Sequence, residues 1–481
     1  MLFNSFQYGI FFPIVFAIYW GLPEKFRWPV ILISSYYFYM SWNVKYVVLI
    51  LFTTIISYFA ALLIERYREN KPAKKFILVF SLIACLGVLF VFKYYNFMAE
   101  SFANFMSLFA IKLHPATLNL LLPVGISFYT FQTLGYVIDV YRGEARAEKN
   151  FGIYAAFISF FPQLVAGPIE RTNNLLPQIK AKHVFNYEQA AYGIKLMTWG
   201  FFKKLAIADT LATYSDKVFN NVYNFQGFAL ILAALFFTIQ IYCDFSGYSD
   251  IARGCAKMMN IDLMENFRSP YFSASIKEFW SRWHISLSTW FRDYVYIPLG
   301  GSRVGKLRHC LNLMITFIIS GLWHGANWTF VIWGAVHGLA QIVENFFTRP
   351  KDLSGLKWAL RVMMTFIFVS FAWIFFRANN VSEAVYIFSN LFTGINNLWE
   401  YFAINGYKVF EIDRLVKIQL TLSIAALFIY DYESLKYDVI NKISSLNLLA
   451  RWFVYEFLVM STAFIYIFFA ANNVNFIYFQ F

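Results

Sequence analysis

Charged residues are scarce in this chain. Asp, Glu, Lys and Arg make up only 14% of its 481 residues, whereas a soluble globular domain carries about 25%. Hydrophobic residues make up 59%, and Phe, Tyr and Trp together reach 22%, which suits a membrane core and its headgroup belts. No long polar stretch interrupts the apolar runs between residues 8 and 471. This composition excludes a soluble, disordered or fibrous protein, and it predicts an all-α polytopic membrane protein whose residues 1–481 form a single domain.

Cysteine and the common nucleotide-binding motifs are also lacking. The four cysteines form no CxxC pair, which excludes a disulfide framework and gives no zinc site. No GxSxG, Walker or GxGxxG motif is present, so hydrolase, ATPase and nucleotide-cofactor functions have no support.

The net charge of +13 would suggest a nucleic-acid partner in a soluble protein. In a polytopic protein it reports basic cytoplasmic loops instead, and we expect no nucleic-acid partner.

Apolar runs of roughly membrane-spanning length recur along the whole chain. They predict about ten to twelve transmembrane helices, and the run at 310–345 is long enough for a helical hairpin or a broken helix. Pro and Gly interrupt the runs at 121–128 and 160–170, which predicts re-entrant elements that line a cavity. The runs lie at 8–22, 28–42, 44–64, 76–98, 118–138, 151–168, 190–213, 228–243, 310–345, 358–376, 415–430 and 452–471.

The segment 269–302 carries too many charges for a spanning helix and is predicted to be amphipathic. Helical spacing pairs Glu278 with Arg282 on one face and puts His284 on the opposite, apolar face. The next loop carries Arg303, Lys306 and Arg308 with no acidic residue. These three are candidates for binding an anionic donor, although an ordinary solvated cytoplasmic loop explains them equally well.

Six histidines divide into two groups by their surroundings. His284, His324 and His337 lie in apolar sequence, where an ionisable side chain is costly and suggests function. On one continuous helix His337 would face away from His324, so we pair His324 with His284. For any single one of them, a structural imidazole bonded to a backbone carbonyl or to another side chain is an equally good explanation. The polar loops hold the other three, which are expected to be solvated: His114, His183 and His309.

Three acidic residues also lie in apolar context. Asp139, Asp244 and Asp250 could act as ligands or protonation partners. The sequence CDFSGYSD at 243–250 is equally compatible with a turn whose Ser and Asp cap the next helix. No third ligand has a persuasive spacing from the histidines, so no metal site is predicted.

Five motifs occur together along the chain. In order they are PVGISFYTFQTLGYVIDVYRG, FPQLVAGPIER, DFSGYSDIARG, FWSRWHISLSTWFRDYVYIPLGGSR and GLWHGANWTFVIWGAVHG. The ordered set resembles the membrane-bound O-acyltransferase superfamily over nearly the whole chain. It is most similar to the bacterial branch of alginate O-acetyltransferase membrane subunits and peptidoglycan O-acetyltransferases, with the teichoic-acid D-alanyl transferases more distant.

The resemblance implies a ring of tilted helices around a thin catalytic centre with a cytoplasmic funnel. It implies N-terminal helices at 1–115, a motif-bearing core at 116–350 and C-terminal helices at 351–471. His324 would be the principal catalytic residue and His284 its support. Further supporting candidates within the motifs are Trp323, Asp244, Arg171 and Asp293.

The resemblance also implies the reaction and its participants. The chain would take acetyl groups from a cytoplasmic thioester, acetyl-CoA or an acyl-carrier protein, and hold no permanent cofactor. An exported SGNH-type acyltransferase would receive them and modify a polysaccharide such as an alginate-like exopolysaccharide or peptidoglycan. The alternative is a transporter of a polar solute or glycan, because broken helices also mark transporter sites. Inverted repeats would favour the transporter, and none is detected.

The C-terminal aromatic motif at 472–481 ends in FIYFQF. It resembles a terminal motif of the same branch, which implies that Tyr478 carries the acetyl group transiently. A phenol ester is a chemically reasonable relay, because a phenolate leaves more readily than an alkoxide. The alternative is an interfacial belt residue that keeps its hydroxyl in water.

Two basic loops predict the orientation in the bacterial cytoplasmic membrane. The loop 65–75 carries five basic and two acidic residues, and the loop 22–27 lies two spans earlier. Basic loops stay cytoplasmic, which puts the N-terminus outside. A cysteine introduced at Asn70 should therefore resist an impermeant thiol reagent in intact cells and react in inverted vesicles. Labelling in intact cells would reverse the topology.

Overall fold

The computed structural model describes residues 1, 3–165, 167–347, 354–404 and 406–469. Every regular element in these ranges is helical, which confirms the predicted all-α fold. The chain forms two compact units. The first comprises Met1–Ile194 and Ala252–Met264, and the second comprises Lys195–Ile251 and Glu265–Phe481. The long helix α12 (Phe228–Met258) contributes to both.

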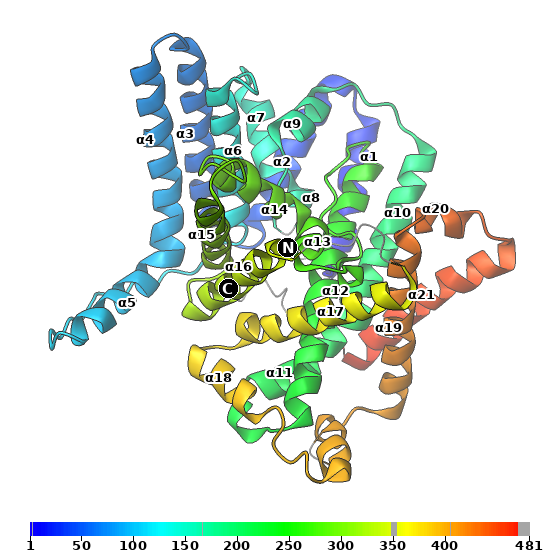
Figure 1. The fold of residues 1–481 in the computed structure, drawn as a ribbon. Helices are drawn as coiled ribbons and strands as arrows, with labels where there is room; N and C mark the ends of the chain where they lie inside the picture. Colours follow the sequence, from blue (N-terminus) through cyan, green and yellow to red (C-terminus); the bar gives the residue numbers. More distant parts are fainter. Residues whose placement is uncertain (2, 166, 348–353, 405, 470–481) are drawn as a thin grey trace. The chain divides into compact units, whose positions relative to one another are not determined.

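The first unit contains the N-terminal helices α1 to α9. In Figure 1 α3 and α4 lie side by side, and α3 also packs against α6 and α7. Small polar residues of α3 are buried in these contacts, and Tyr154 of α7 donates a hydrogen bond to Ser57 at 2.6 Å. The helices are α1 (Phe6–Gly21), α2 (Arg27–Met40), α3 (Val47–Arg66), α4 (Lys71–Leu89), α5 (Tyr95–Ser107), α6 (Ile126–Arg142), α7 (Phe151–Ser159), α8 (Phe161–Leu164) and α9 (Thr172–Lys180).

Both predicted helix breaks occur in this unit, and they pack against each other. Helix α6 begins only after Gly125, so the predicted span 118–138 starts too early. Gly125 has a φ of 75°, which favours glycine, and a β-carbon there would lie 2.6 Å from the carbonyl oxygen of Leu164. Leu164 ends the four-residue helix α8 within the second break. The Pro and Gly residues thus stop helices where two chain segments meet.

The second unit contains the remaining α-helices and, among its shorter helical turns, η4 and η7. They are the end of α10 (Tyr187–Phe201), the π-helical turn η4 (Phe202–Ala208), α11 (Asp209–Phe219), most of α12, α13 (Ile276–Arg282), α14 (Ile285–Phe291), the π-helical turn η7 (Arg292–Tyr296), α15 (Lys306–His324), α16 (Trp328–Asn345), α17 (Gly355–Arg377), α18 (Val381–Asn390), α19 (Arg414–Ser434), α20 (Val439–Ser444) and α21 (Leu448–Phe469).

The segment 243–250 lies inside α12 and is no turn, so its suggested capping role is wrong. Its glycine serves close packing instead. A β-carbon at Gly247 would lie 2.8 Å from the carbonyl oxygen of Gly200 in α10. The two helices therefore approach each other backbone to backbone at this point.

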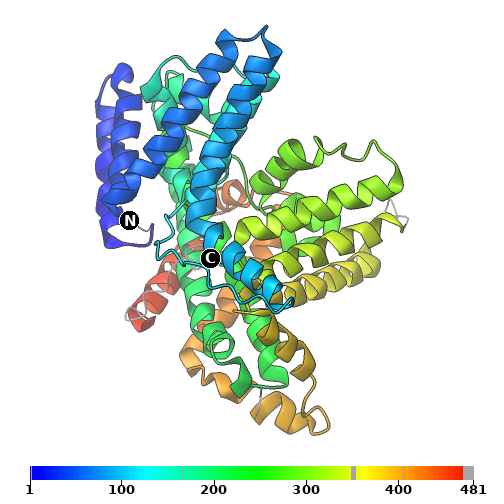
Figure 2. The same ribbon diagram turned by 90° about the vertical axis from the view of Figure 1, so that its left-hand side faces the viewer.

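The run at 310–345 forms a helical hairpin, one of its two predicted forms. Figure 2 shows α15, α16 and α17 stacked in order, in green to yellow. Two glycines allow α15 and α16 to touch: the Cα of Gly334 lies 3.4 Å from the position that a β-carbon at Gly321 would take. The tight contact brings the end of α15, with His324, against the start of α16.

Six helices in the described ranges are long and apolar enough to cross a membrane. They confirm a polytopic membrane protein, while several other predicted spans are shorter or broken helices. The six are Val44–Arg66, Lys71–Ser107, Phe228–Met258, Gly355–Arg377, Arg414–Ser434 and Leu448–Ile467.

The hairpin predicts a strong effect of one added methyl group. In Gly334→Ala the new β-carbon would lie 2.3 Å from the carbonyl oxygen of Phe317, so the helices must part. Overpacking of this kind costs about 1–3 kcal/mol. We expect a lower midpoint of thermal unfolding in detergent. Gly87→Ala is the control, because nothing lies within 4 Å of that site in α4; equal midpoints for the two variants would contradict the close contact.

Candidate active site

His284 lies at a break between two short helices. The predicted continuous amphipathic helix over 269–302 is wrong, because α13 ends at Arg282 and α14 begins at Ile285. His284 itself adopts φ 43° and ψ 54°, a left-handed conformation that residues with a β-carbon rarely take. Such strain persists only where the surroundings enforce it.

Asn266 enforces this break. Its backbone carbonyl accepts a hydrogen bond from the amide of Ile285 at 2.9 Å. Its side-chain Oδ1 accepts bonds from the amide of Ser286 at 3.3 Å and from the hydroxyl of Ser286 at 2.6 Å. These contacts satisfy donors at the start of α14 that have no partner within the helix. Asn266 was not among the predicted residues, since an asparagine after a helix carries no distinctive signal.

Two features predicted for this segment are present. Arg282 donates to Glu278 at 2.7 Å, as the helical spacing indicates. His284 is fully buried at 0% exposure. Its ring packs edge to face against Phe245 of α12, with the ring centroids 4.6 Å apart.

His284 and His324 lie together, as the predicted pairing requires. Their ring centroids are 6.4 Å apart, and His324 is only 3% exposed. Aromatic rings surround His324, with centroid distances of 4.9 Å to Trp323, 5.1 Å to Trp333 and 5.3 Å to Phe376. Burial lowers the pKa of His284 to about 3. That imidazole is therefore neutral at physiological pH and able to accept a hydrogen bond.

His337 lies on the next helix and belongs to the same aromatic cluster. Trp333 packs against both His324 and His337, with ring centroids 5.1 Å and 5.0 Å away. The Nδ1 atom of His337 accepts a hydrogen bond from the indole of Trp280 at 3.2 Å. His324 and His337 thus share a contact with the same indole ring.

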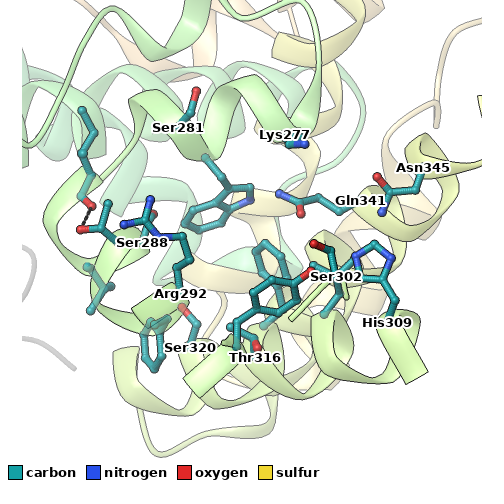
Figure 3. Close-up of a pocket in the computed structure, with 18 residues that line it drawn as sticks. Lys277, Ser281, Ser288, Arg292, Ser302, His309, Thr316, Ser320, Gln341 and Asn345 are labelled. Atoms are coloured by element: carbon teal, nitrogen blue, oxygen red, sulfur yellow. Dashed lines mark hydrogen bonds between the residues drawn. The ribbon is translucent and has the colours of Figure 1, made fainter. Parts of the chain in front are cut away.

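A cavity of about 550 Å³ is lined by residues of α13, α14, α15 and α16 (Figure 3). Its wall includes Ile285, the residue after His284, and Ser320, one helical turn before His324. Lys277, Arg292 and His309 also line it. No acidic side chain is among its lining residues in the described chain, so the cavity is cationic. Arg292 forms an ion pair with Asp293, whose Oδ1 accepts a hydrogen bond from Nε of Arg292 at 2.7 Å.

The predicted basic segment borders the cavity, because Ser302 and His309 on either side of it are lining residues. It is only partly a loop, since Lys306 and Arg308 lie in the first turn of α15. Arg303, Lys306 and Arg308 are exposed, and none is among the residues that line the cavity. Lys277 and Arg292 were missed because single cations inside short helices read as ordinary amphipathic positions.

Two of the acidic candidates, Asp244 and Asp250, are held by ion pairs. Lys204 lies 2.7 Å from Asp244 and 2.8 Å from Asp209, and Lys203 lies 2.6 Å from Asp250. These buried pairs join η4 to α12. No group of three metal-ligating side chains occurs within the described part of the chain.

The other candidates have separate places. Trp323 is buried against His324, whereas Arg171 precedes α9 in the first unit. Asp139 is buried in the last turn of α6. Tyr478 lies outside the described residues.

The loop histidines differ from one another. His114 is exposed as expected. His183 is buried, contrary to prediction, because its Nε2 bonds to the Gln178 carbonyl at 2.7 Å and its own carbonyl accepts from Arg27. His309 is half-buried at the cavity and not fully solvated.

Comparison with known proteins identifies the family. The model of the membrane-bound O-acyltransferase family matches residues 149–383. The probable alginate O-acetylase of Pseudomonas aeruginosa is 41% identical over 387 residues, 80% of this chain and 73% of that protein. The chain belongs to the membrane-bound O-acyltransferase family. It is an O-acyltransferase, and this outcome favours the enzyme over the transporter alternative.

Two further relatives carry different activities in their names. The peptidoglycan O-acetyltransferase of Helicobacter pylori is 37% identical over 428 residues, 81% of this chain and 79% of that protein. The teichoic acid D-alanyltransferase of Bacillus subtilis is 29% identical over 334 residues, 64% and 80% of the two chains. Both histidines and the whole cavity fall within the residues that match the family.

Proposed function

We propose that this membrane O-acyltransferase moves acetyl groups from cytoplasmic acetyl-CoA towards a cell-surface polysaccharide. The observation that carries the proposal is a cationic cavity whose wall reaches within one helical turn of two buried histidines. Relatives that acetylate alginate and peptidoglycan support an acetyl group and a glycan acceptor.

The cavity suits an anionic thioester. Lys277 and Arg292 present cationic donors, which bind phosphate oxygens through charge-assisted hydrogen bonds. Trp280, Phe291 and Phe317 supply apolar wall for the arm that carries the thioester. A volume of about 550 Å³ falls within the usual range of small-molecule sites.

His324 is proposed as the general base. A neutral imidazole takes the proton of the attacking hydroxyl as the new carbon–oxygen bond forms at the thioester carbonyl. The carbon–sulfur bond then breaks, and the leaving thiolate takes that proton, so the products are an ester and a thiol. His284 is proposed to orient the donor or stabilise the developing charge. The aromatic shell excludes water, which would otherwise hydrolyse the donor.

The acceptor side of the proposal rests on the family resemblance. Tyr478 would carry the acetyl group as a phenol ester and pass it to an exported SGNH-type acyltransferase. That partner would modify an alginate-like polysaccharide or peptidoglycan outside the cytoplasmic membrane. An acyl-carrier protein is the alternative donor.

Removal of His324 tests the proposed base. His324→Ala should lower the O-acetyl content of the surface polysaccharide at least about 10²-fold, since general-base catalysis contributes that much. Membrane levels of the protein should be unchanged and are measured by immunoblot. His114→Ala, at an exposed position, is the matched control. Wild-type acetylation in His324→Ala would refute the assignment.

Two sets of charge substitutions test where the donor binds. Lys277→Gln with Arg292→Gln should raise the KM for acetyl-CoA about tenfold in inverted vesicles, because charge-assisted bonds to phosphate are lost. The triple replacement of Arg303, Lys306 and Arg308 by Gln, outside the cavity lining, should change it less than about twofold. A larger rise of the KM for acetyl-CoA in the triple variant than in the double variant would place the donor at residues 303–308 and contradict binding in the cavity.

A further inference from the structure

One face of α16 runs from the histidine pair to the cavity. Trp333, His337, Gln341 and Asn345 occur at intervals of four residues, which places them along one side of the helix. Trp333 packs against His324, and Gln341 and Asn345 line the cavity. Figure 3 shows Gln341 and Asn345 on the same helix at the edge of the cavity. His337 lies on α16 between Trp333, which contacts His324, and Gln341, which lines the cavity.

His337 contacts the cavity through Trp280. The indole of Trp280 lines the cavity and donates its Nε1 hydrogen to Nδ1 of His337 at 3.2 Å. The two rings are nearly perpendicular, with an angle of 87° and centroids 5.2 Å apart. Trp280 also packs against Phe317 of α15, 5.3 Å away.

The hydrogen bond determines the protonation state of His337. An indole nitrogen can only donate, so Nδ1 of His337 must hold a lone pair and the ring proton must lie on Nε2. The imidazole is therefore neutral while the bond exists. Its Nε2 has no hydrogen-bond partner within the described residues, and the surrounding groups are the rings of Phe279, Phe317, Trp333 and Phe368. The hydrogen bond to Nδ1 of His337 thus holds the indole of Trp280 in one orientation.

We propose that His337 is a positioning residue that fixes Trp280 as the wall against which the thioester donor is aligned. The inference rests on the proposed use of the cavity by acetyl-CoA. Trp280 lies on α13, two residues after Glu278 and four before His284, so its orientation is set on the same segment as the histidine. His337 would contribute to donor binding without exchanging a proton during the reaction.

The role predicts an effect on KM and not on kcat. Trp280→Phe keeps a ring and removes the donor, and His337→Leu removes the acceptor. Each should raise the KM for acetyl-CoA about fivefold, the usual worth of one neutral hydrogen bond, with kcat within about twofold. The double variant should resemble either single variant, because both remove the same bond. His337→Asn should restore the wild-type KM, since its amide oxygen can take the place of Nδ1.

The measurement is thiol release from acetyl-CoA by inverted vesicles of the expressing cells, with His324→Ala vesicles as the blank. A wild-type KM in both Trp280→Phe and His337→Leu would overturn the positioning role. So would lost kcat in His337→Asn, which would make His337 a reacting group. An absent wild-type signal would contradict acetyl-CoA as donor, and is thereby distinguished from failure of the positioning role alone.

Discussion

The burial of two imidazoles side by side within a shell of aromatic rings is the constraint on which the site depends. A buried ionisable group is costly unless it is neutral or paired. Here burial keeps His284 neutral, and rings of Phe245, Trp323 and Trp333 take the place of water. The same shell that keeps His284 neutral would also protect a reactive thioester from hydrolysis.

Much of the surrounding structure serves to hold this pair. Asn266 stabilises the left-handed turn at His284, and close glycine contacts bring α16 against the end of α15. Buried ion pairs between η4 and α12 anchor the helix that presents Phe245 to His284. A buried ion pair is costly to break, because the remaining charge has no partner. These contacts explain how a site made of short, broken helices is kept in one geometry.

Composition and polar groups in apolar surroundings were the signals that predicted much of the structure from sequence. The membrane class, the breaks at Gly125 and Leu164 and the pairing of His284 with His324 all came from such signals. The break at His284 was missed, since the helical period runs on through Trp283 and the contacts that stop it come from the segment around Asn266. The cations of the cavity were also missed. Tertiary packing brings Lys277 and Arg292 to the wall of the same cavity, and the sequence alone does not show this. Tyr478 stays a prediction.

Catalysis as proposed requires the donor to occupy the cationic cavity with its thioester at the two histidines. The most direct test is a cryo-electron microscopy structure with an acetyl-CoA analogue whose thioester is replaced by a ketone. We predict phosphate density beside Lys277 and Arg292 and the carbonyl carbon next to His324 and His284. Density for the analogue outside this cavity, or a carbonyl remote from both imidazoles, would contradict the proposed mechanism.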